Sequence, residues 1–393
     1  MIRAVHYEQK NRELSAEILS FAPEKVKDVQ EFHRSFPGYR ETPLVRLRCL
    51  AEQIGAESIY VKDESYRFGL NAFKVLGGSY CIGRYIAEKL GREIRELPFD
   101  VMTGQEIRDR LGEQTFITAT DGNHGRGIAW TAKQLGQKSV VYMPRGTKEE
   151  RLRNIRALGA EASVLDMNYD DTVRRACRDA QERGWILTQD TSWEGYEKIP
   201  EWIMKGYTTM AAEAVSQLAG VRPTHVFLQA GVGSMAGAAA AYLSACFGTD
   251  RPVITIVEPD KADCIFRTAE AADGKLHAVT GDLDTVMAGL ACGEPFPLAW
   301  EILKDCADHF ISMPDYVAEK GMRILGRPCG DDRTVISGES GAAALGFAVE
   351  VMTDPRLADL KEKIGLDRGS RILCFSTEGA TDRENYSRIL RGV

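Results

Sequence analysis

Short apolar runs alternate with longer amphipathic segments through most of this chain, and this alternation predicts an α/β architecture. Residues 139–143, 162–165 and 185–188 have the length of buried strands. The segments between them, 148–158 and 169–183, carry apolar residues at helical spacing. Strands that alternate with helices in this way form parallel sheets whose faces are covered by the helices. We therefore expect an α/β fold with parallel-rich sheets flanked by helices.

Four apolar runs are followed by segments that contain glycine, hydroxyl or amide residues. These segments are residues 65–80, 118–127, 226–237 and 371–382. A turn that joins a strand to a helix exposes backbone N–H groups at the positive end of the helix, where a phosphate or a carboxylate can bind. Each segment alone also fits an ordinary turn or helix cap. A functional interpretation therefore depends on their combination.

Lys74 stands between apolar neighbours at the predicted start of a helix, after the short strand 58–62. Burial disfavours the charged form of an amine, so a half-buried lysine loses its proton easily. A neutral amine is a nucleophile and can form a Schiff base with an aldehyde. The alternative is a lysine whose stem is buried at a helix end while its charge stays in water. The other three segments favour the reactive interpretation.

The third segment also fits the dinucleotide fingerprint G-x-G-x-x-A, with Gly231, Gly233 and Ala236 at the fixed positions. Glu258 ends the next predicted strand about 20 residues later, where a ribose-binding carboxylate is expected. An NAD-dependent oxidoreductase is therefore one alternative. A lone glycine fingerprint is a weak signal, and this one lies late in the chain. We expect Glu258 to be an ordinary residue at the end of a strand.

In their order along the chain, the four segments resemble the fold-type II pyridoxal phosphate (PLP) enzymes, the family of tryptophan synthase beta chain and threonine dehydratase. Along the chain, members of that family have first a Schiff-base lysine, then an asparagine-containing substrate loop, then a glycine-rich phosphate loop and finally a serine after a late strand. The resemblance extends over residues 42–382 or so. Within the family, residues 68–74 and 120–127 are similar to the ammonia-lyases that act on diaminopropionate.

The resemblance implies that PLP is bound by residues from all four segments. Lys74 would hold the cofactor covalently, and its amine would serve as a base once it is released. Asn123 would contact the ring hydroxyl, and Ser376 or its neighbour Thr377 would face the pyridine nitrogen. The phosphate would be bound through the loop that comprises Gly231, Val232, Gly233 and Ser234.

The substrate is expected at the second segment. By resemblance, its carboxylate would bind to Thr120 and to the backbone N–H groups of Gly122 and His124. Asp121 departs from many relatives, which carry a small hydroxyl residue at this place. Its carboxylate could attract a second substrate ammonium, or it could act as a base on the face opposite Lys74, so that both enantiomers of an amino acid could react. The alternative is that Asp121 caps the following helix.

Three further polar residues have open roles. Asp190, which follows the predicted strand 185–188, is a second candidate for binding the side-chain ammonium of the substrate, and a turn or helix-cap role is an equal alternative. We expect His124 to be structural rather than a general acid. Glu339 could lie near the cofactor ring or favour a helix N-terminus.

The activity implied by the resemblance is PLP-dependent α,β-elimination of 2,3-diaminopropionate to pyruvate and two molecules of ammonia. Both enantiomers would react if Asp121 serves as a second base. A serine or threonine dehydratase is the nearest alternative, but its hydroxyl substrate offers no second cation to pair with Asp121. A PLP-binding module without catalysis is a third alternative. The resemblance also implies a homodimer.

The composition of the chain excludes several classes of partner and suggests a cellular location. The 393-residue chain has a net charge of −7, which argues against a nucleic-acid or anionic-membrane partner. Its longest apolar stretch, residues 235–247, is too short to span a membrane, and the N-terminus lacks the apolar core of a signal peptide. Nine cysteines without C-x-x-C pairs predict no metal site, and their odd number favours reduced thiols and a cytoplasmic location. Cys264 and Cys292 could approach each other.

No low-complexity linker divides the chain. The resemblance implies a smaller domain inserted after the lysine, at about residues 76–220. Residues 1–75 and 221–393 would then form the large PLP-binding domain. The active site is expected in the cleft between the two domains. The carboxyl ends of parallel strands are also where ligands usually bind in α/β sheets.

Overall fold

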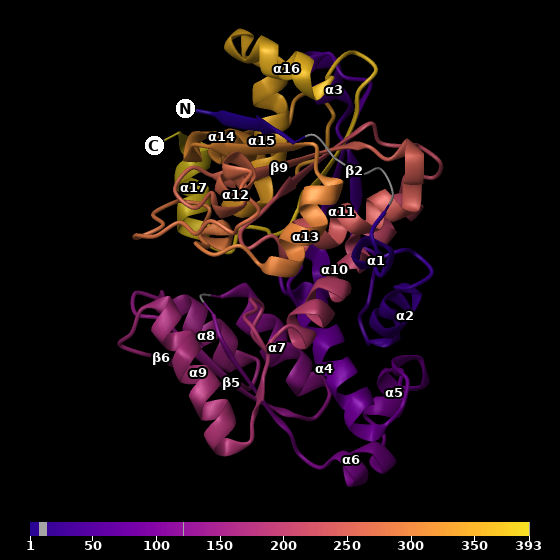
Figure 1. Cartoon of the computed structure of the whole chain (residues 1–393), viewed down its shortest axis with the longest axis vertical. Helices are drawn as coiled ribbons and strands as arrows, with labels where there is room; N and C mark the ends of the chain where they lie inside the picture. The colour runs from indigo at the N-terminus through magenta and orange to yellow at the C-terminus, as the bar shows by residue number, and fades with distance from the viewer. Residues whose placement is uncertain (8–13, 121, 393) are drawn as a thin grey trace. The chain divides into compact units, whose positions relative to one another are not determined.

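The computed structural model describes residues 1–7, 14–120 and 122–392. The chain folds into two compact units (Figure 1). Unit 1 comprises Met1–Lys25, Glu41–Ala72 and Met210–Val393. Unit 2 comprises Val26–Arg40 and Phe73–Thr209.

These units differ from the expected bounds at three places, and the smallest difference is that residues 73–75, which include Lys74, belong to unit 2. Residues 26–40 belong to unit 2, because the segment that contains α2 (Lys27–Ser35) packs there through aromatic rings. Phe36, for example, stacks on Trp130 with the ring centroids 5.7 Å apart. The second boundary falls inside α10 (Lys198–Gln217), earlier than expected. A boundary within a helix leaves no linker pattern in the sequence.

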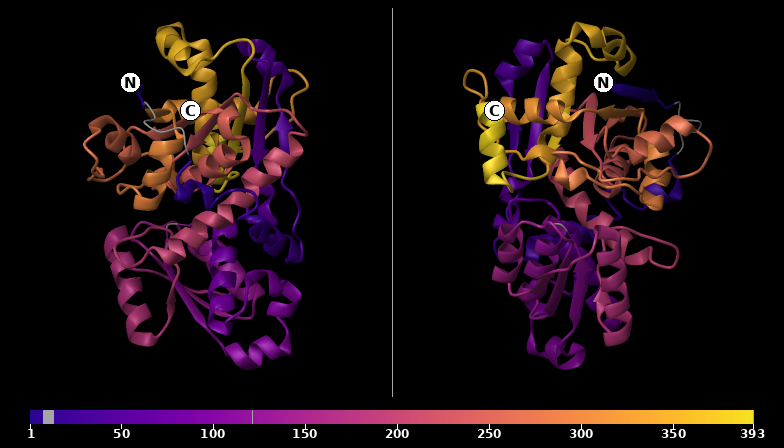
Figure 2. Two further views of the ribbon diagram at one scale, coloured as in Figure 1. Left: turned by 45° about the vertical axis from the view of Figure 1, so that its right-hand side comes forward. Right: turned by 90° about the vertical axis from the view of Figure 1, so that its left-hand side faces the viewer.

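Unit 1 is built on a seven-stranded sheet with the order β1-β10-β9-β8-β11-β3-β2. The strands are β1 (Arg3–His6), β2 (Leu44–Arg46), β3 (Ser58–Asp63), β8 (His225–Gln229), β9 (Val253–Pro259), β10 (His309–Met313) and β11 (Arg371–Ser376). The edge strands β1 and β2 are antiparallel to their neighbours, and the strands between them are parallel. In Figure 2 the indigo strand β3 lies beside the yellow strand β11, because Ser58 pairs with Arg371. Segments from opposite ends of the chain thus form one sheet.

Helices bury the apolar faces of this sheet. They are α1 (Ala16–Leu19), α3 (Arg48–Ile54), α11 (Ser234–Phe247), α12 (Cys264–Ala271), α13 (Pro297–Cys306), α14 (Asp315–Gly326), α15 (Glu339–Thr353), α16 (Ala358–Ile364) and α17 (Arg383–Arg391). Residues 339–352 of α15 are all buried. Phe347 of this helix packs near Phe227 of β8, with ring centroids 5.9 Å apart. Apart from Glu339, Ser340 and Glu350, the buried residues of α15 are apolar or glycine, as is expected of a helix in a core.

Unit 2 has a four-stranded parallel sheet with the order β6-β5-β4-β7. Its strands are β4 (Thr115–Ala119), β5 (Lys138–Met143), β6 (Glu161–Val164) and β7 (Ile186–Leu187). Its further helices include α4 (Val75–Leu90), α5 (Phe99–Met102), α6 (Gln105–Leu111), α7 (Asn123–Gln134), α8 (Glu149–Ala157) and α9 (Tyr169–Arg183), of which α8 and α9 are drawn in magenta in Figure 1. Successive strand residues point to opposite faces. Val141 accordingly packs with Ile155 of α8, and Val140 packs with Ala176 of α9.

The expectation of an α/β fold with parallel-rich sheets is confirmed. The predicted helix 169–183 coincides with α9, and the predicted strand 139–143 lies within β5. In the part of the chain that the structure describes, no helix has both the length and the apolar character needed to cross a membrane.

Candidate active site

Lys74 lies at the start of α4, and its amine contacts a carboxylate from a distant segment of unit 2. Its Nζ donates a hydrogen bond to Oδ2 of Asp190 at 2.8 Å, and the lysine side chain is 25% exposed. Nδ1 of His124 lies 3.6 Å from the same oxygen. Burial alone would raise the pKa of Asp190, but the charges of His124 and Lys74 outweigh it and lower that pKa to about 2. Asp190 is therefore ionised at physiological pH.

The imidazole of His124 is fixed in orientation. The side chain is buried, and Nε2 lies 2.7 Å from the carbonyl oxygen of Thr188. A carbonyl oxygen only accepts, so Nε2 carries a proton and Nδ1 faces Asp190. His124 thus links the loop that follows β4 to the segment that follows β7.

The loop between β4 and α7 is organised by its own polar groups. Thr120 Oγ1 accepts a hydrogen bond from the backbone N–H of Gly122 at 3.0 Å. Gly122 caps α7, and Asn123 is the first residue of that helix. The first turn of a helix offers backbone N–H groups that have no partner within the helix. Asp121 lies outside the described residues, so its predicted roles remain predictions.

The glycine at position 127 allows two helices of unit 2 to meet. A Cβ there would lie 2.9 Å from Cα of Val75 and 3.2 Å from the carbonyl oxygen of Lys74. The first turns of α4 and α7 therefore approach each other more closely than any side chain would permit. This packing explains one glycine of the second segment without reference to a ligand, and it fixes α7 against the backbone of Lys74.

The segment that leads to Lys74 is anchored in unit 1 by a buried network of two cations and two carboxylates. Arg67, on the 3-10 helix η1 (residues 64–69), donates two hydrogen bonds of 2.8 Å to Glu213 and two of 2.9 Å to Glu64. Lys62 Nζ donates to Glu213 at 2.6 Å. Burial would raise the pKa of Glu213, but Arg67 and Lys62 lower it to about 2. Because its charges balance, this network can be buried.

A backbone bridge joins the lysine segment to the end of β11. Ala72, two residues before Lys74, pairs with Glu378 in an isolated antiparallel bridge. Glu378 in turn follows Ser376 and Thr377. The chain just before the lysine is thus held at the strand end that carries the two candidate hydroxyl groups.

Both hydroxyl groups have partners that the sequence did not indicate. Ser376 Oγ donates to Oγ of Ser337 at 2.7 Å. Gln229 Nε2 donates to Oγ1 of Thr377 at 3.0 Å. Gln229 could have been noticed, because it is a polar residue at the end of the fully buried strand β8. No sequence signal connects Ser337 with Ser376.

The loop between β8 and α11 has the features of a phosphate site. Gly233, at the N-terminus of α11, has a φ of +99°, a conformation that glycine adopts without strain. No side chain caps this helix. The hydroxyl of Ser234 is buried and has no hydrogen-bond partner among the described residues. A buried hydroxyl of this kind beside uncapped helix N–H groups fits a phosphate group. With Gly231 and Val232, these residues fit the phosphate of PLP.

Two cysteines flank this loop. Cys264 Sγ lies 3.7 Å from the carbonyl oxygen of Gly231, and a Cβ at Gly231 would lie 3.1 Å from Sγ of Cys292. The sequence left open whether they approach each other, and both contact the same glycine. All nine cysteines, which lie within the described residues, are free thiols.

Glu258 does not have the geometry of a ribose ligand. It is fully buried, and its carboxylate accepts hydrogen bonds from the backbone N–H groups of Ile265 at 2.9 Å and Phe266 at 2.6 Å. These residues belong to the first turn of α12. Glu258 therefore caps a helix. Glu339 begins α15 and accepts from the amide of Asn385, which fits the helix N-terminus interpretation.

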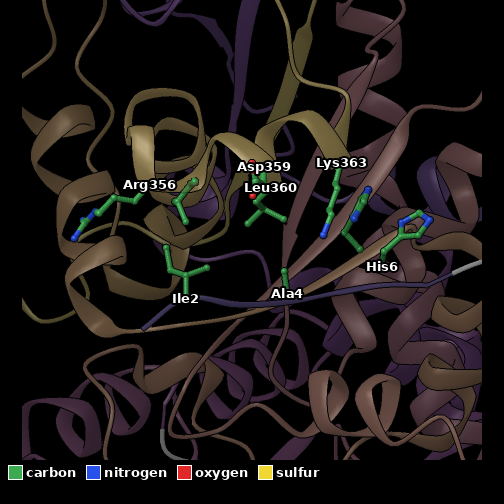
Figure 3. A pocket seen from close by; sticks show the side chains of 9 residues that line it. Ile2, Ala4, His6, Arg356, Asp359, Leu360 and Lys363 are labelled. Atoms are coloured by element: carbon green, nitrogen blue, oxygen red, sulfur yellow. The ribbon is translucent and has the colours of Figure 1, made fainter.

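A pocket of about 260 Å³ in unit 1 shares no residue with this candidate site. Figure 3 shows that it is lined by side chains from β1 and from the region of α16. His6 and His309 are among the lining residues, with their ring centroids 4.9 Å apart. Burial and the neighbouring His6 lower the pKa of His309 to about 4. His309 is therefore uncharged at neutral pH.

Known proteins resemble this chain in both sequence and fold. Residues 35–377 match the family model described as pyridoxal-phosphate dependent enzyme. A diaminopropionate ammonia-lyase of Escherichia coli K12 is 52% identical over 373 residues, which are 94% of this chain and 92% of that protein. Its counterpart in Salmonella typhimurium LT2 is 50% identical over 367 residues, 92% of this chain and 91% of that protein.

A crystal structure of the holo diaminopropionate ammonia lyase from Escherichia coli superposes with a TM-score of 0.91 at 49% identity. The superposition covers 99% of this chain and 96% of that one. The family match spans most of the chain and includes Lys74, the loop after β4 and the loop after β8. This chain therefore belongs to the family of pyridoxal-phosphate dependent enzymes.

Proposed function

We propose that this protein is a PLP-dependent ammonia-lyase that converts 2,3-diaminopropionate to pyruvate and two molecules of ammonia. The relatives that are 50% and 52% identical are diaminopropionate ammonia-lyases. The observation that carries the proposal is the contact between Lys74 and Asp190, because it puts an ionised carboxylate 2.8 Å from the amine of the cofactor lysine. A substrate with two ammonium groups can use such a carboxylate.

PLP, when bound, supplies an aldehyde for the lysine amine and an electron sink that makes the α proton of the substrate acidic. Lys74 would hold it covalently. The phosphate would be bound by the loop from Gly231 to Ser234, whose buried hydroxyl would gain a partner. Asn123 would contact the ring, and Ser376 or Thr377 would face its nitrogen. A neutral hydroxyl at this nitrogen suits elimination.

Lys74 would move the proton in both halves of the reaction. Once released, its amine would remove the α proton, because it is a base that lies on one face of the cofactor ring. The ammonium that results can give this proton to the amino group that leaves the β carbon. Ammonia leaves only after its nitrogen is protonated, so this second transfer matters more here than in a dehydratase.

Asp190 would bind the side-chain ammonium of the substrate. In the structure its carboxylate pairs with the ammonium of Lys74. Once that amine is bound to the cofactor, Asp190 gives up this partner, and Nδ1 of His124 remains 3.6 Å from its carboxylate. Asp190 can then attract the second ammonium of diaminopropionate. Serine has no group at this position that carries a charge, so Asp190 would distinguish the two substrates.

Thr120, Gly122 and His124 would receive the substrate carboxylate at the N-terminus of α7, by the attraction of helix N–H groups for anions. Asp121 would be the second base and would remove the α proton of the enantiomer that Lys74 does not reach. We expect Asp121→Asn to lose turnover of one enantiomer selectively. Equal loss with both enantiomers would contradict this role.

The test is pyruvate release by PLP-loaded protein from D-2,3-diaminopropionate and L-2,3-diaminopropionate, with D-serine and L-serine in parallel. We expect rapid release from diaminopropionate and little from serine. Rapid release from serine alone would establish a serine dehydratase instead. Release from none of these substrates would overturn the proposed activity.

The assembly and location of the enzyme form part of the proposal. We infer a homodimer in the cytoplasm, where it would take part in amino-acid breakdown. The nine free thiols suit a reducing compartment. Light scattering on the PLP-loaded protein is expected to give the mass of two chains, and the mass of one chain would contradict a homodimer.

A further inference from the structure

A cluster of three potential metal ligands lies in unit 1 and shares no residue with the candidate active site. It comprises Cys49 of α3 together with Cys329 and Asp332 in the loop after α14. Two thiol sulfurs and a carboxylate oxygen all lie within 4.8 Å of one another. The three residues are half-buried, so a cation can reach them from solvent. We propose that this cluster binds a soft divalent cation of the Zn²⁺ class.

A tight turn presents two of the ligands to the third. The backbone N–H of Asp332 donates to the carbonyl oxygen of Cys329 at 3.2 Å, which closes a four-residue turn. Gly330, the second residue of the turn, has a φ of +51°. A Cβ at this position would collide with Sγ of Cys49. The turn therefore needs glycine both for its backbone and for its contact with Cys49.

Asp332 also caps α3, and this role is the alternative to metal binding. Its two oxygens accept hydrogen bonds from the backbone N–H groups of Cys49 at 3.1 Å and Leu50 at 2.9 Å. A carboxylate has about four lone-pair positions, so two remain for a cation. The cap holds the carboxylate toward the thiols, with Oδ2 lying 3.9 Å from Sγ of Cys329. Capping alone does not account for the two sulfurs that meet at the same carboxylate.

The ligand set selects a soft cation. Thiolates bind Zn²⁺ at about 2.3 Å and carboxylates at about 2.0–2.2 Å, so tetrahedral geometry places neighbouring ligand atoms roughly 3.5–3.8 Å apart. The cluster would have to contract by roughly 1 Å at most. Three protein ligands leave the fourth position to water. Each thiol gives up its proton to solvent on binding, so the affinity falls as the pH is lowered.

The cation would fasten the loop of residues 327–338 to α3. Farther along this loop, Arg333 donates to the hydroxyl of Tyr66 at 3.1 Å, and Ser337 contacts Ser376. None of the three ligands has been assigned a contact with PLP or substrate. We therefore expect the cation to raise thermal stability and to leave turnover unchanged.

The sequence predicted no metal site, because its cysteines lack the short spacing of zinc motifs. The ligands of this cluster come from segments far apart in the chain, and only the fold brings them together. The structure thus assigns a site that spacing rules do not find.

The test uses PLP-loaded full-length protein that has been reduced and freed of metal by a chelator. Zn²⁺ is then titrated in competition with a chromophoric chelator, and bound metal is measured after gel filtration. We expect one equivalent of Zn²⁺ per chain. Cys49→Ser and Cys329→Ser should each lower the affinity at least tenfold, while Cys177→Ser, which changes a half-buried thiol on α9, should leave it unchanged.

Two results would overturn the proposal. One is a reduced wild-type protein that takes up no Zn²⁺, and the other is an affinity that is the same in Cys49→Ser and wild type. Cd²⁺ is a second probe, whose thiolate absorption should appear in wild type and be absent from the two cysteine variants. Pyruvate release is expected to be equal in wild type and both variants, and parallel loss of activity and metal would place the cluster in catalysis instead.

Discussion

Two loops that look alike in the sequence differ in how their polar atoms are used. The loop after β4 and the loop after β8 both join a buried strand to a helix through glycine and hydroxyl residues. In the first, Thr120 accepts a hydrogen bond from the backbone of its own loop, and Gly127 of the following helix α7 faces the backbone of Lys74 and Val75. In the second, the hydroxyl of Ser234 is buried and lacks a partner within the described part of the chain.

This difference separates a hydroxyl that is bonded within its own loop from a hydroxyl whose hydrogen bond must come from a ligand. A polar atom bonded within the chain stabilises the loop itself. A buried polar atom without a partner costs free energy until a ligand bonds to it. A glycine-rich pattern therefore does not reveal the role of a loop, whereas the partner of each polar atom does.

The largest effect is expected from Gly127→Ala. The added Cβ would lie 2.9 Å from the backbone of Val75, and backbone atoms cannot move aside as a side chain can. We expect unfolding in urea to show a loss of about 3 kcal/mol, with a matching loss of pyruvate release. Gly369→Ala is the control, because its Cβ would meet Asp367 at an ordinary 3.4 Å. A Gly127→Ala protein as stable as wild type would show that the two helices are not in close contact.

The stability of the protein should respond differently to acid at Asp190 in unit 2 and at His309 in unit 1. Asp190 has a lowered pKa of about 2, so the stability that its ion pairs provide is present above about pH 4 and is lost only as the pH falls toward 2. His309, in unit 1, has a pKa lowered to about 4, while an unfolded histidine titrates near 6.5. The unfolded state therefore binds a proton first, and stability falls from about pH 6.5 down to 4.

This second effect is expected to amount to about 2 kcal/mol between pH 7 and pH 4.5. His309→Gln should reduce that loss, and the quantity to compare is the change in unfolding free energy with pH. His277, whose side chain is 38% exposed, provides the control variant His277→Gln. If His309→Gln and wild type lose the same stability over this range, the buried imidazole is not its source.

The smallest effects are expected from removing the hydroxyl groups of Ser234 and Thr120. Ser234→Ala should weaken PLP binding about tenfold, equivalent to about 1.4 kcal/mol, and leave the PLP-free protein at least as stable. Thr120→Val should do the reverse, with PLP affinity unchanged and stability lowered by about 1 kcal/mol. Titration with PLP and urea unfolding of the PLP-free protein measure the two quantities. Equal behaviour of the two variants would remove the distinction between the loops.

Much of the fold follows from the sequence because buried parallel strands are continuous apolar runs and the helices between them keep a helical period. Helix α9 and strand β5 were predicted on this basis. The unit bounds were not, because the place of residues 26–40 depends on aromatic packing such as that of Phe36 on Trp130. Likewise, α10 gives no local sign that the unit boundary lies within it.

The site could be predicted in part for the same reason. Lys74 was predicted from a local pattern, a lysine among apolar residues at the start of a helix. Its contact with Asp190 was not predictable from the sequence, since α4 must pack on α7 and β7 must pair with β4 before the two segments meet. Ser337 beside Ser376 is a similar case. Local chemistry can be read from the sequence, whereas partners from distant segments require the fold.

The central claim is that Asp190 selects a substrate with two ammonium groups, and its most direct test is kcat/KM of Asp190→Asn for diaminopropionate and for serine. Loss of a contact between charged groups is worth about 1.5–3 kcal/mol, so we expect kcat/KM for diaminopropionate to fall about 10- to 100-fold. The value for serine should change little. Asp179→Asn, which alters a buried carboxylate of α9 that pairs with Arg175, is expected to leave the ratio of the two values unchanged. An equal fall for both substrates would contradict the claim and would show that Asp190 serves Lys74 alone.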